Sequence, residues 1–135
     1  TDNTFRGSQK ITRQELMVMT ARYLDGTKRA FVKYIQALGE EGEFTIDTSF
    51  DIKKYDGGAT RDREAYSKGS RELYSFALRL ALIDALYRDD KPPIIIDDAF
   101  MSLDDEHLRS ALKLLSKLGE ERQIIYFTCA KARSI

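Results

Sequence analysis

The chain has 135 residues, of which 42% are hydrophobic and 33% charged, a balance typical of one soluble domain with its own core. Its 22 basic residues equal its 22 acidic residues, so no overall charge favours nucleic acid or a membrane surface. The single cysteine, Cys129, excludes an internal disulfide and suits a reducing compartment. No apolar run approaches the roughly 20 residues that a membrane span requires, so we expect no membrane partner.

Residues 11–38 have the apolar periodicity of a helix. Apolar residues recur at intervals of seven with others beside them: Met17, Leu24, Phe31 and Leu38, flanked by Leu16, Tyr23, Ala30 and Ala37. Gly26 interrupts this stripe, and we expect it to divide the helix in two. The pattern favours an amphipathic helix packed on a sheet, and the end of a longer coiled coil stays open as the alternative.

Two short strands are predicted after this helix. Residues 44–46 and 50–55 alternate apolar with polar side chains, as half-buried antiparallel strands do. Residues 56–58 (Asp-Gly-Gly) indicate a turn, and the charged residues 59–65 indicate an exposed loop. We therefore expect a small antiparallel pair.

The second half of the chain predicts a helix followed by a strand–helix–strand unit. Residues 70–87 are apolar on most sides, which is typical of a deeply packed helix. Ile94-Ile95-Ile96, after two prolines, predicts a buried strand; residues 104–118 predict an amphipathic helix, and residues 123–128 a second strand. This order predicts a βαβ unit with parallel strands, and hence an α/β fold.

Three features in this half carry chemistry. Tyr66-Ser67-Lys68-Gly69-Ser70 is a small polar turn that opens a helix, which indicates either a phosphate site or a plain N-cap. Asp97 and Asp98 end the buried strand, where desolvation penalises unpaired anions and a divalent cation such as Mg²⁺ relieves the penalty. The alternative for this pair is a set of loop-edge acids or helix caps.

The third feature is Ser102-Leu103-Asp104, directly before the amphipathic helix. Taken alone it indicates a helix cap, and Ser102 with Asp105 has the spacing of a capping box with Asp in place of Glu.

In order and spacing, these features resemble the C-terminal lobe of an ABC-type ATPase head of the SMC, RecF and RecN-like group. Four segments carry the resemblance: 66–70 the signature motif, 77–82 (A-L-R-L-A-L) the helix that it opens, 94–98 the Walker B strand, and 102–104 the D-loop. The resemblance implies the C-terminal half of a P-loop nucleotide-binding domain. Residues 40–135 would form this lobe, and residues 1–39 would be a helical segment returning from a coiled coil.

The resemblance also implies ATP and Mg²⁺ as cofactors and assigns roles to residues. Asp97 would hold Mg²⁺, and Asp98 takes the position of the catalytic carboxylate that orients the attacking water. The implied cofactor-binding residues are Ser67, Lys68, Gly69, Ser70, Ser102 and Asp104. Ser67 and Gly69, with the N-terminus of their helix, would contact the γ-phosphate of a nucleotide held by a partner head. Asp104 and Ser102 would cross the dimer interface.

The sequence departs from the family pattern in two respects. No Gly-Lys dipeptide occurs, so the Walker A loop is missing and the chain alone should be inactive. The family's switch histidine is also absent near Cys129 and Ala130, where Thr128 or Lys131 are candidate substitutes. We interpret Cys129 as a small buried apolar residue and the sole histidine, His107, as a surface residue.

We therefore expect a fragment of a larger ATPase, an interpretation that the start at Thr1 favours. Its implied partners are an N-terminal Walker A lobe, a second head in a homodimer, and DNA, in repair, recombination or chromosome maintenance. The implied location is cytoplasmic or nucleoid-associated. Without the other lobe, we expect exposed apolar surface and self-association.

Two other interpretations fit parts of the sequence. A non-catalytic head-like dimerisation or interaction module remains the alternative, favoured by the missing histidine. A phospho-receiver domain also places two acids at a strand end, but only 37 of the 135 residues follow Asp98 and no acid ends the strand at 123–128.

Overall fold

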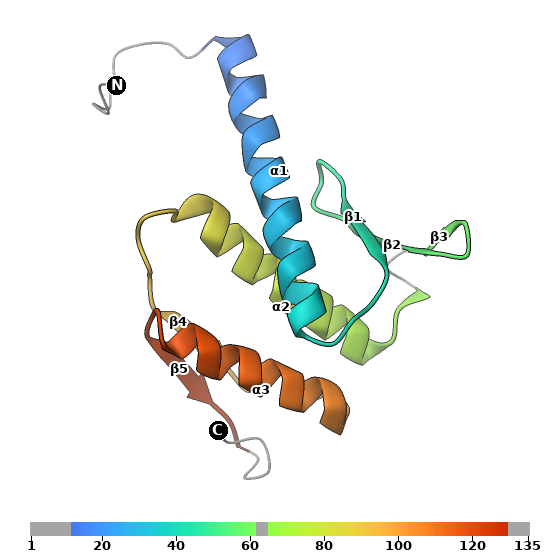
Figure 1. Cartoon of the computed structure of the whole chain (residues 1–135), viewed down its shortest axis with the longest axis vertical. Coiled ribbons are helices and arrows are strands. Elements are labelled where there is room, and N and C mark those ends of the chain that lie inside the picture. Colours follow the sequence, from blue (N-terminus) through green and yellow to red (C-terminus); the bar gives the residue numbers. More distant parts are fainter. Residues whose placement is uncertain (1–11, 62–64, 130–135) are drawn as a thin grey trace.

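A computed structural model describes residues 12–61 and 65–129 of the chain (Figure 1). The elements follow in the order α1 (Arg13–Ala37), β1 (Glu43–Ile46), β2 (Ile52–Asp56), β3 (Ala59–Arg61), α2 (Lys68–Leu86), β4 (Ile94–Asp97), α3 (Asp105–Gly119) and β5 (Ile124–Phe127). The helix start predicted at Ile11 lies outside the described residues, as do Ala130 and Lys131. No helix in the described part of the chain is long and apolar enough to cross a membrane.

Helix α1 begins with a capping box, in which Thr12 and Glu15 satisfy each other's backbone N–H groups. It then runs through Gly26 without a break, so the prediction of a divided helix is wrong. One glycine in a helix costs only about 1 kcal/mol. The tertiary packing of the following turns, which bury Phe31 and Ile35, outweighs this cost.

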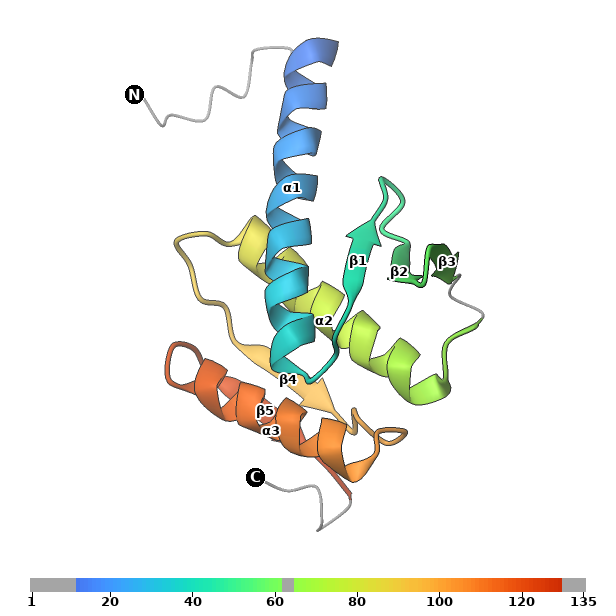
Figure 2. The same cartoon turned by 45° about the vertical axis from the view of Figure 1, so that its right-hand side comes forward.

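The two halves of α1 have different surroundings. The C-terminal half packs mainly along α2, with Phe31 also in contact with Phe44 of β1, whereas the sequence had predicted packing on a sheet. The N-terminal half projects beyond the rest of the fold in both views (Figures 1 and 2). Its apolar residues are exposed, namely Leu16, Met17, Val18, Met19 and Tyr23. The predicted apolar stripe is therefore buried along only half of its length.

The predicted antiparallel pair is confirmed and extended by a third strand. β1 pairs with β2, placing Phe44 opposite Lys54, and β2 pairs with β3, placing Tyr55 opposite Thr60. Part of the charged segment at 59–65 is thus a strand and not a loop. Gly57 and Gly58 have φ values of 57° and 89°, which permits the tight reversal that brings β3 beside β2.

The predicted parallel unit is confirmed. β4 and β5 pair in parallel, with Ile95 opposite Ile125, and α3 connects them. Helix α3 buries one face, formed by Leu108, Ala111, Leu114, Leu115 and Leu118, which confirms the predicted amphipathic helix. Leu112, which the periodicity placed on this face, is only half-buried, and Leu114 is buried in addition. Together with the antiparallel strands and packed helices, this unit confirms the α/β class.

One hydrophobic core joins the helices to both sheets, with Phe31, Leu73 and Phe100 at its centre. On the two-stranded sheet, however, Ile95 is 67% exposed and Phe127 is 55% exposed. The expected exposure of apolar surface is therefore confirmed on β4 and β5.

A polar cluster beside the core ties the helices together. The buried Arg122 donates to Asp84 over 2.7 Å, and the hydroxyl of Tyr34 donates to the other oxygen of the same carboxylate. Burial and the nearby Asp84 raise the pKa of the Tyr34 hydroxyl, which keeps it protonated as a donor. The end of α1, the end of α2 and the segment before β5 are thereby held in a fixed relation.

Candidate functional site

The signature segment begins α2, and Ser67 is its N-cap. The Oγ atom of Ser67 accepts from the backbone N–H of Ser70 over 3.0 Å and lies 2.9 Å from the Ser70 hydroxyl. Tyr66 is buried, and its hydroxyl accepts from the backbone of Lys54 and donates to the carbonyl of Arg61, each over 2.8 Å. The signature turn is thus both a helix cap and a segment anchored to the antiparallel sheet.

Gly69 lies against the backbone of the D-loop. A Cβ atom at this position would stand 2.6 Å from the carbonyl oxygen of Ser102, closer than real Cβ atoms approach any heavy atom. The N–H of Ser102 in turn donates to the Glu72 carboxylate over 2.9 Å. The first turns of α2 and the D-loop are therefore in direct contact, and only glycine fits at position 69.

Asp104 caps the N-terminus of α3. One carboxylate oxygen accepts from the backbone N–H groups of Glu106 and His107, over 3.1 and 2.9 Å. The backbone and then the imidazole of His107 lower the pKa of this carboxyl group, which keeps it ionised. The predicted capping box of Ser102 with Asp105 is wrong, because Asp104 itself is the cap and the Ser102 N–H is directed to Glu72.

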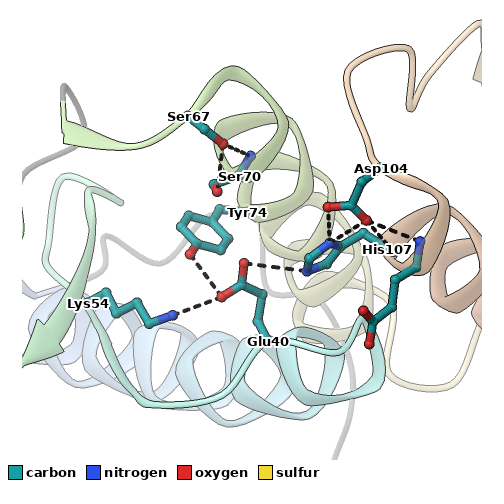
Figure 3. Close-up of polar contacts among 8 residues, drawn as sticks. Glu40, Lys54, Ser67, Ser70, Tyr74, Asp104 and His107 are labelled. Carbon is teal, nitrogen blue, oxygen red and sulfur yellow. Dashed lines mark hydrogen bonds and ion pairs between the residues drawn. The ribbon is translucent and has the colours of Figure 1, made fainter.

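The prediction that His107 is a surface residue is wrong, because its side chain is only 29% exposed. Nδ1 lies 2.9 Å from both oxygens of Asp104, while Nε2 lies 3.8 Å from Glu40 (Figure 3). Glu40, in the connection from α1 to β1, also accepts from Lys54 and Tyr74. Burial and Glu40 raise the pKa of the Tyr74 hydroxyl, so it stays a donor.

The Walker B strand ends at a more open edge. Asp97 is exposed and Asp98 is half-buried, so the prediction of a desolvated pair of acids is wrong for this chain. The exposure of Asp97 leaves its carboxylate accessible to solvent. Asp98 has a left-handed backbone, with φ at 45°, and its N–H donates to the carbonyl of Phe127 over 2.9 Å.

Cys129 lies beside Asp98 and is exposed, so its predicted burial is wrong. Its thiol donates to the Asp98 carboxylate over 3.4 Å. The strand pairing places this contact, because β5 ends alongside β4 and delivers Cys129 to the end of the Walker B strand.

These acids fit a shared magnesium site and not a closed metal centre. In the described ranges, no three His, Cys, Asp or Glu side chains are grouped so as to hold a metal ion. Asp97 and Asp98 present carboxylates at one strand end, and Mg²⁺ usually takes one or two protein carboxylates together with water and substrate phosphates.

The structure brings most of the predicted cofactor-binding residues to one cleft of about 130 Å³. Its lining includes Ser67, Gly69, Ser70, Ser102 and Asp104, together with Glu40 and His107. Lys68 and the two Walker B acids do not line it. The sequence reasoning missed Glu40, because no local pattern indicates that a carboxylate after α1 reaches the N-terminus of α3.

No family model matches the chain. An uncharacterized protein of Mycobacterium tuberculosis is 27% identical over an alignment of 128 residues, which covers 87% of this chain and 15% of that protein. The uncharacterized protein YhaN of Bacillus subtilis is 38% identical over 73 residues, covering 53% of this chain and 8% of YhaN. A component of the nuclease SbcCD of Lactococcus lactis is 30% identical over 92 residues, covering 64% of this chain and 9% of that component. The chain thus spans only a small part of each relative.

Solved structures of SMC proteins share the fold. An SMC ATPase studied for ATP-driven dimerization and DNA-stimulated activation has a TM-score of 0.70 at 21% identity, covering 83% of this chain and 72% of that one. The Smc head domain with coiled coil and joint from Pyrococcus yayanosii has a TM-score of 0.64 at 21% identity, covering 82% and 23%. The chain therefore has the fold of SMC head domains, and its resemblance to the C-terminal region of an SMC-like ABC-type ATPase head is confirmed.

Proposed function

We propose that this chain supplies the Walker B and signature residues of an ATP-hydrolysing head within a longer protein. Asp97 holds Mg²⁺, and Asp98 accepts a hydrogen bond from the attacking water and orients it. Ser67 and Gly69, with the N-terminus of α2, contact the γ-phosphate of a nucleotide held by a second head, with Lys68 and Ser70 in the same motif. Ser102 and Asp104 lie at the interface between the heads. Magnesium supplies charge neutralisation when it is bound.

The observation that carries this proposal is the contact between the signature turn and the D-loop at Gly69 and Ser102. It places the N-termini of α2 and α3 at one cleft, where helix dipoles favour anions. The first turn of α2 contains no acidic residue and its cap is a neutral serine, whereas α3 begins with Asp105 and Glu106. The N-terminus of α2 is thus the one suited to a phosphate.

The first test is Mg²⁺-ATP turnover by this chain alone and in a mixture with the Walker A lobe of the same protein. We expect turnover only in the mixture, and a loss of about 10²- to 10⁴-fold on Asp98→Asn because the water loses its base. Asp90→Asn is the matched control, since Asp89 and Asp90 form a second exposed acidic pair before β4. No turnover in a confirmed complex would favour a non-catalytic head that only dimerises or docks a partner.

We further propose that residues 1–39 return from a coiled coil and that the longer protein acts on DNA. The exposed apolar residues in the N-terminal half of α1 support the first point, because they are suited to a partner helix. The likeness to a component of the nuclease SbcCD supports the second. Turnover of the full-length protein with and without double-stranded DNA tests it, and an unchanged rate would count against a DNA partner.

A further inference from the structure

Glu40 is fixed to the end of α1 by its backbone. Its N–H donates to the carbonyl of Ile35 over 3.1 Å, and the preceding Gly39 has φ at 88°, the left-handed conformation that closes many helices. Its side chain is only 12% exposed. The position of this carboxylate therefore follows the position of α1.

The Glu40 carboxylate contacts three other elements. Oε2 accepts from Lys54 of β2 over 2.9 Å and from the hydroxyl of Tyr74 of α2 over 3.1 Å (Figure 3). Oε1 lies 3.8 Å from Nε2 of His107 on α3. Two donors from separate elements hold the carboxylate in one orientation, toward the imidazole.

The imidazole continues the connection to the D-loop. An ionised carboxylate only accepts hydrogen bonds, so Nδ1 of His107 carries a proton and donates to Asp104 over 2.9 Å. Nε2 then faces Glu40 at 3.8 Å, beyond hydrogen-bond distance, and this contact is an ion pair when Nε2 also carries a proton. A chain of contacts runs from the end of α1 through Glu40 and His107 to Asp104.

We infer that Glu40 and His107 are positioning residues that hold the D-loop carboxylate Asp104 beside the signature turn and make its orientation depend on α1. The expected effect on turnover rests on the proposed function, whereas the contacts that link Glu40, His107 and Asp104 lie within this chain. Movement of α1 displaces Glu40 and frees one side of the His107 ring, so the ring no longer fixes the Asp104 carboxylate, which keeps its two backbone donors in α3. Lys54 and Tyr74 keep Glu40 oriented and do not themselves contact Asp104.

The first measurement uses the fact that His107 is the sole histidine of the chain, so its ring gives one set of NMR signals. We expect Glu40→Gln to shift the ring ¹⁵N and C–H resonances, because Nε2 loses its charged neighbour. Glu41→Gln removes an exposed carboxylate next in sequence and should leave the signals in place. Equal spectra for both variants would overturn the inference, whether or not the protein hydrolyses ATP.

The second measurement is steady-state turnover of the full-length protein. We expect Glu40→Gln and His107→Leu each to lower kcat by about tenfold with little change in KM for ATP, the size of one lost charge-assisted contact. The double variant should lose no more than either single one, because both act through one connection. His107→Gln should recover part of the rate, since its amide N–H₂ still donates to Asp104.

The two measurements distinguish a failure of the positioning role from a failure of the proposed function. Shifted His107 signals with unchanged kcat, in a protein whose turnover is lost on Asp98→Asn, would overturn the positioning role and leave the proposed function intact. Additive losses in the double variant, or no recovery by His107→Gln, would also overturn it. Turnover that does not respond to Asp98→Asn would instead overturn the proposed function.

Discussion

Two regions of the molecule differ in how they are held: the signature corner and the Walker B edge. The corner comprises residues 66–70, Ser102, Asp104, His107 and Glu40, and the edge comprises Asp97 and Asp98. In the corner, backbone contact and a run of hydrogen bonds fix each element within this chain. At the edge, Asp97 is exposed, and the sheet beneath it shows Ile95 to solvent. One region is organised by contacts within the chain, whereas the other presents an exposed carboxylate beside exposed apolar side chains.

This difference shows which of the two regions local capping and packing can shape. The corner is made where helices α2 and α3 begin, so local capping and close packing are sufficient to shape it. The edge lies where the two-stranded sheet ends, and there Asp98 contacts Phe127 and Cys129 while Asp97 is exposed. Substitutions should therefore act differently in the two regions.

The largest effect should come from Phe100, which joins them. Phe100 lies between Asp98 and Ser102 in the sequence and is fully buried, with its ring centroid 4.9 Å from that of Phe76. Phe100→Ala should destabilise the chain by about 3–5 kcal/mol, because it leaves a cavity in the core. Urea unfolding measures this. Phe127→Ala, at a ring that is 55% exposed, is the matched control and should change stability by less than about 1 kcal/mol. Equal losses would refute the contrast.

Gly69→Ala should break the corner without touching the edge. The added methyl group would meet the Ser102 carbonyl oxygen at 2.6 Å, so α2 and the D-loop must separate. We expect a loss of about 1–3 kcal/mol, the usual cost of overpacking. Thermal unfolding measures the loss, and a variant as stable as the parent would show that the close contact does not exist.

Gly26→Ala makes the same change in a helix where the space is open. No heavy atom lies within 4 Å of the added Cβ, and α1 is helical on both sides. We expect a gain of about 0.4–1 kcal/mol, because alanine restricts the unfolded chain and suits a helix. Paired melting curves of the two alanine variants would shift in opposite directions. A loss at Gly26 would mean that α1 does not run through this position.

The smallest effect on stability is expected at the edge itself. Ile95→Ser replaces a residue that is 67% exposed, so the free energy of unfolding should change by less than about 0.5 kcal/mol. Self-association should fall, because apolar surface is removed from the open face. Sedimentation velocity tests this, with Leu86→Ser, at a residue that is 62% exposed on another part of the fold, as control. A monodisperse parent chain would contradict the expectation of self-association.

The sequence predicted the elements well where periodicity decides them. The alternation at 44–46 and the apolar face of 104–118 each indicate one secondary structure, because burial on one side imposes a period. The isoleucine run at 94–96 predicted the strand correctly, but its predicted burial is wrong at Ile95, which is 67% exposed. The sequence pattern failed at β3, whose three residues are exposed and depend on the glycine turn before them. It failed at Gly26 because neighbouring turns outweigh a single unfavourable residue.

The site was predictable as far as motifs are local. Ser67, Gly69 and Asp104 lie at helix starts, and their spacing along the sequence is enough to indicate polar turns there. Glu40 was not predictable, because its partners come from β2, α2 and α3 and no sequence spacing relates them. The exposure of Asp97 was missed because the sequence does not show which elements pack over the end of a strand. A strand tip is buried only if another element covers it.

The long first helix has a mechanical consequence. Its 25 residues extend about 37 Å, of which the exposed N-terminal half contributes about 16 Å beyond the core. Such a rigid rod acts as a lever, so a tilt of about 10° in the core moves its free end by about 3 Å. Conversely, a sideways movement of the free end displaces Glu40, at the packed end of the helix, by a smaller distance.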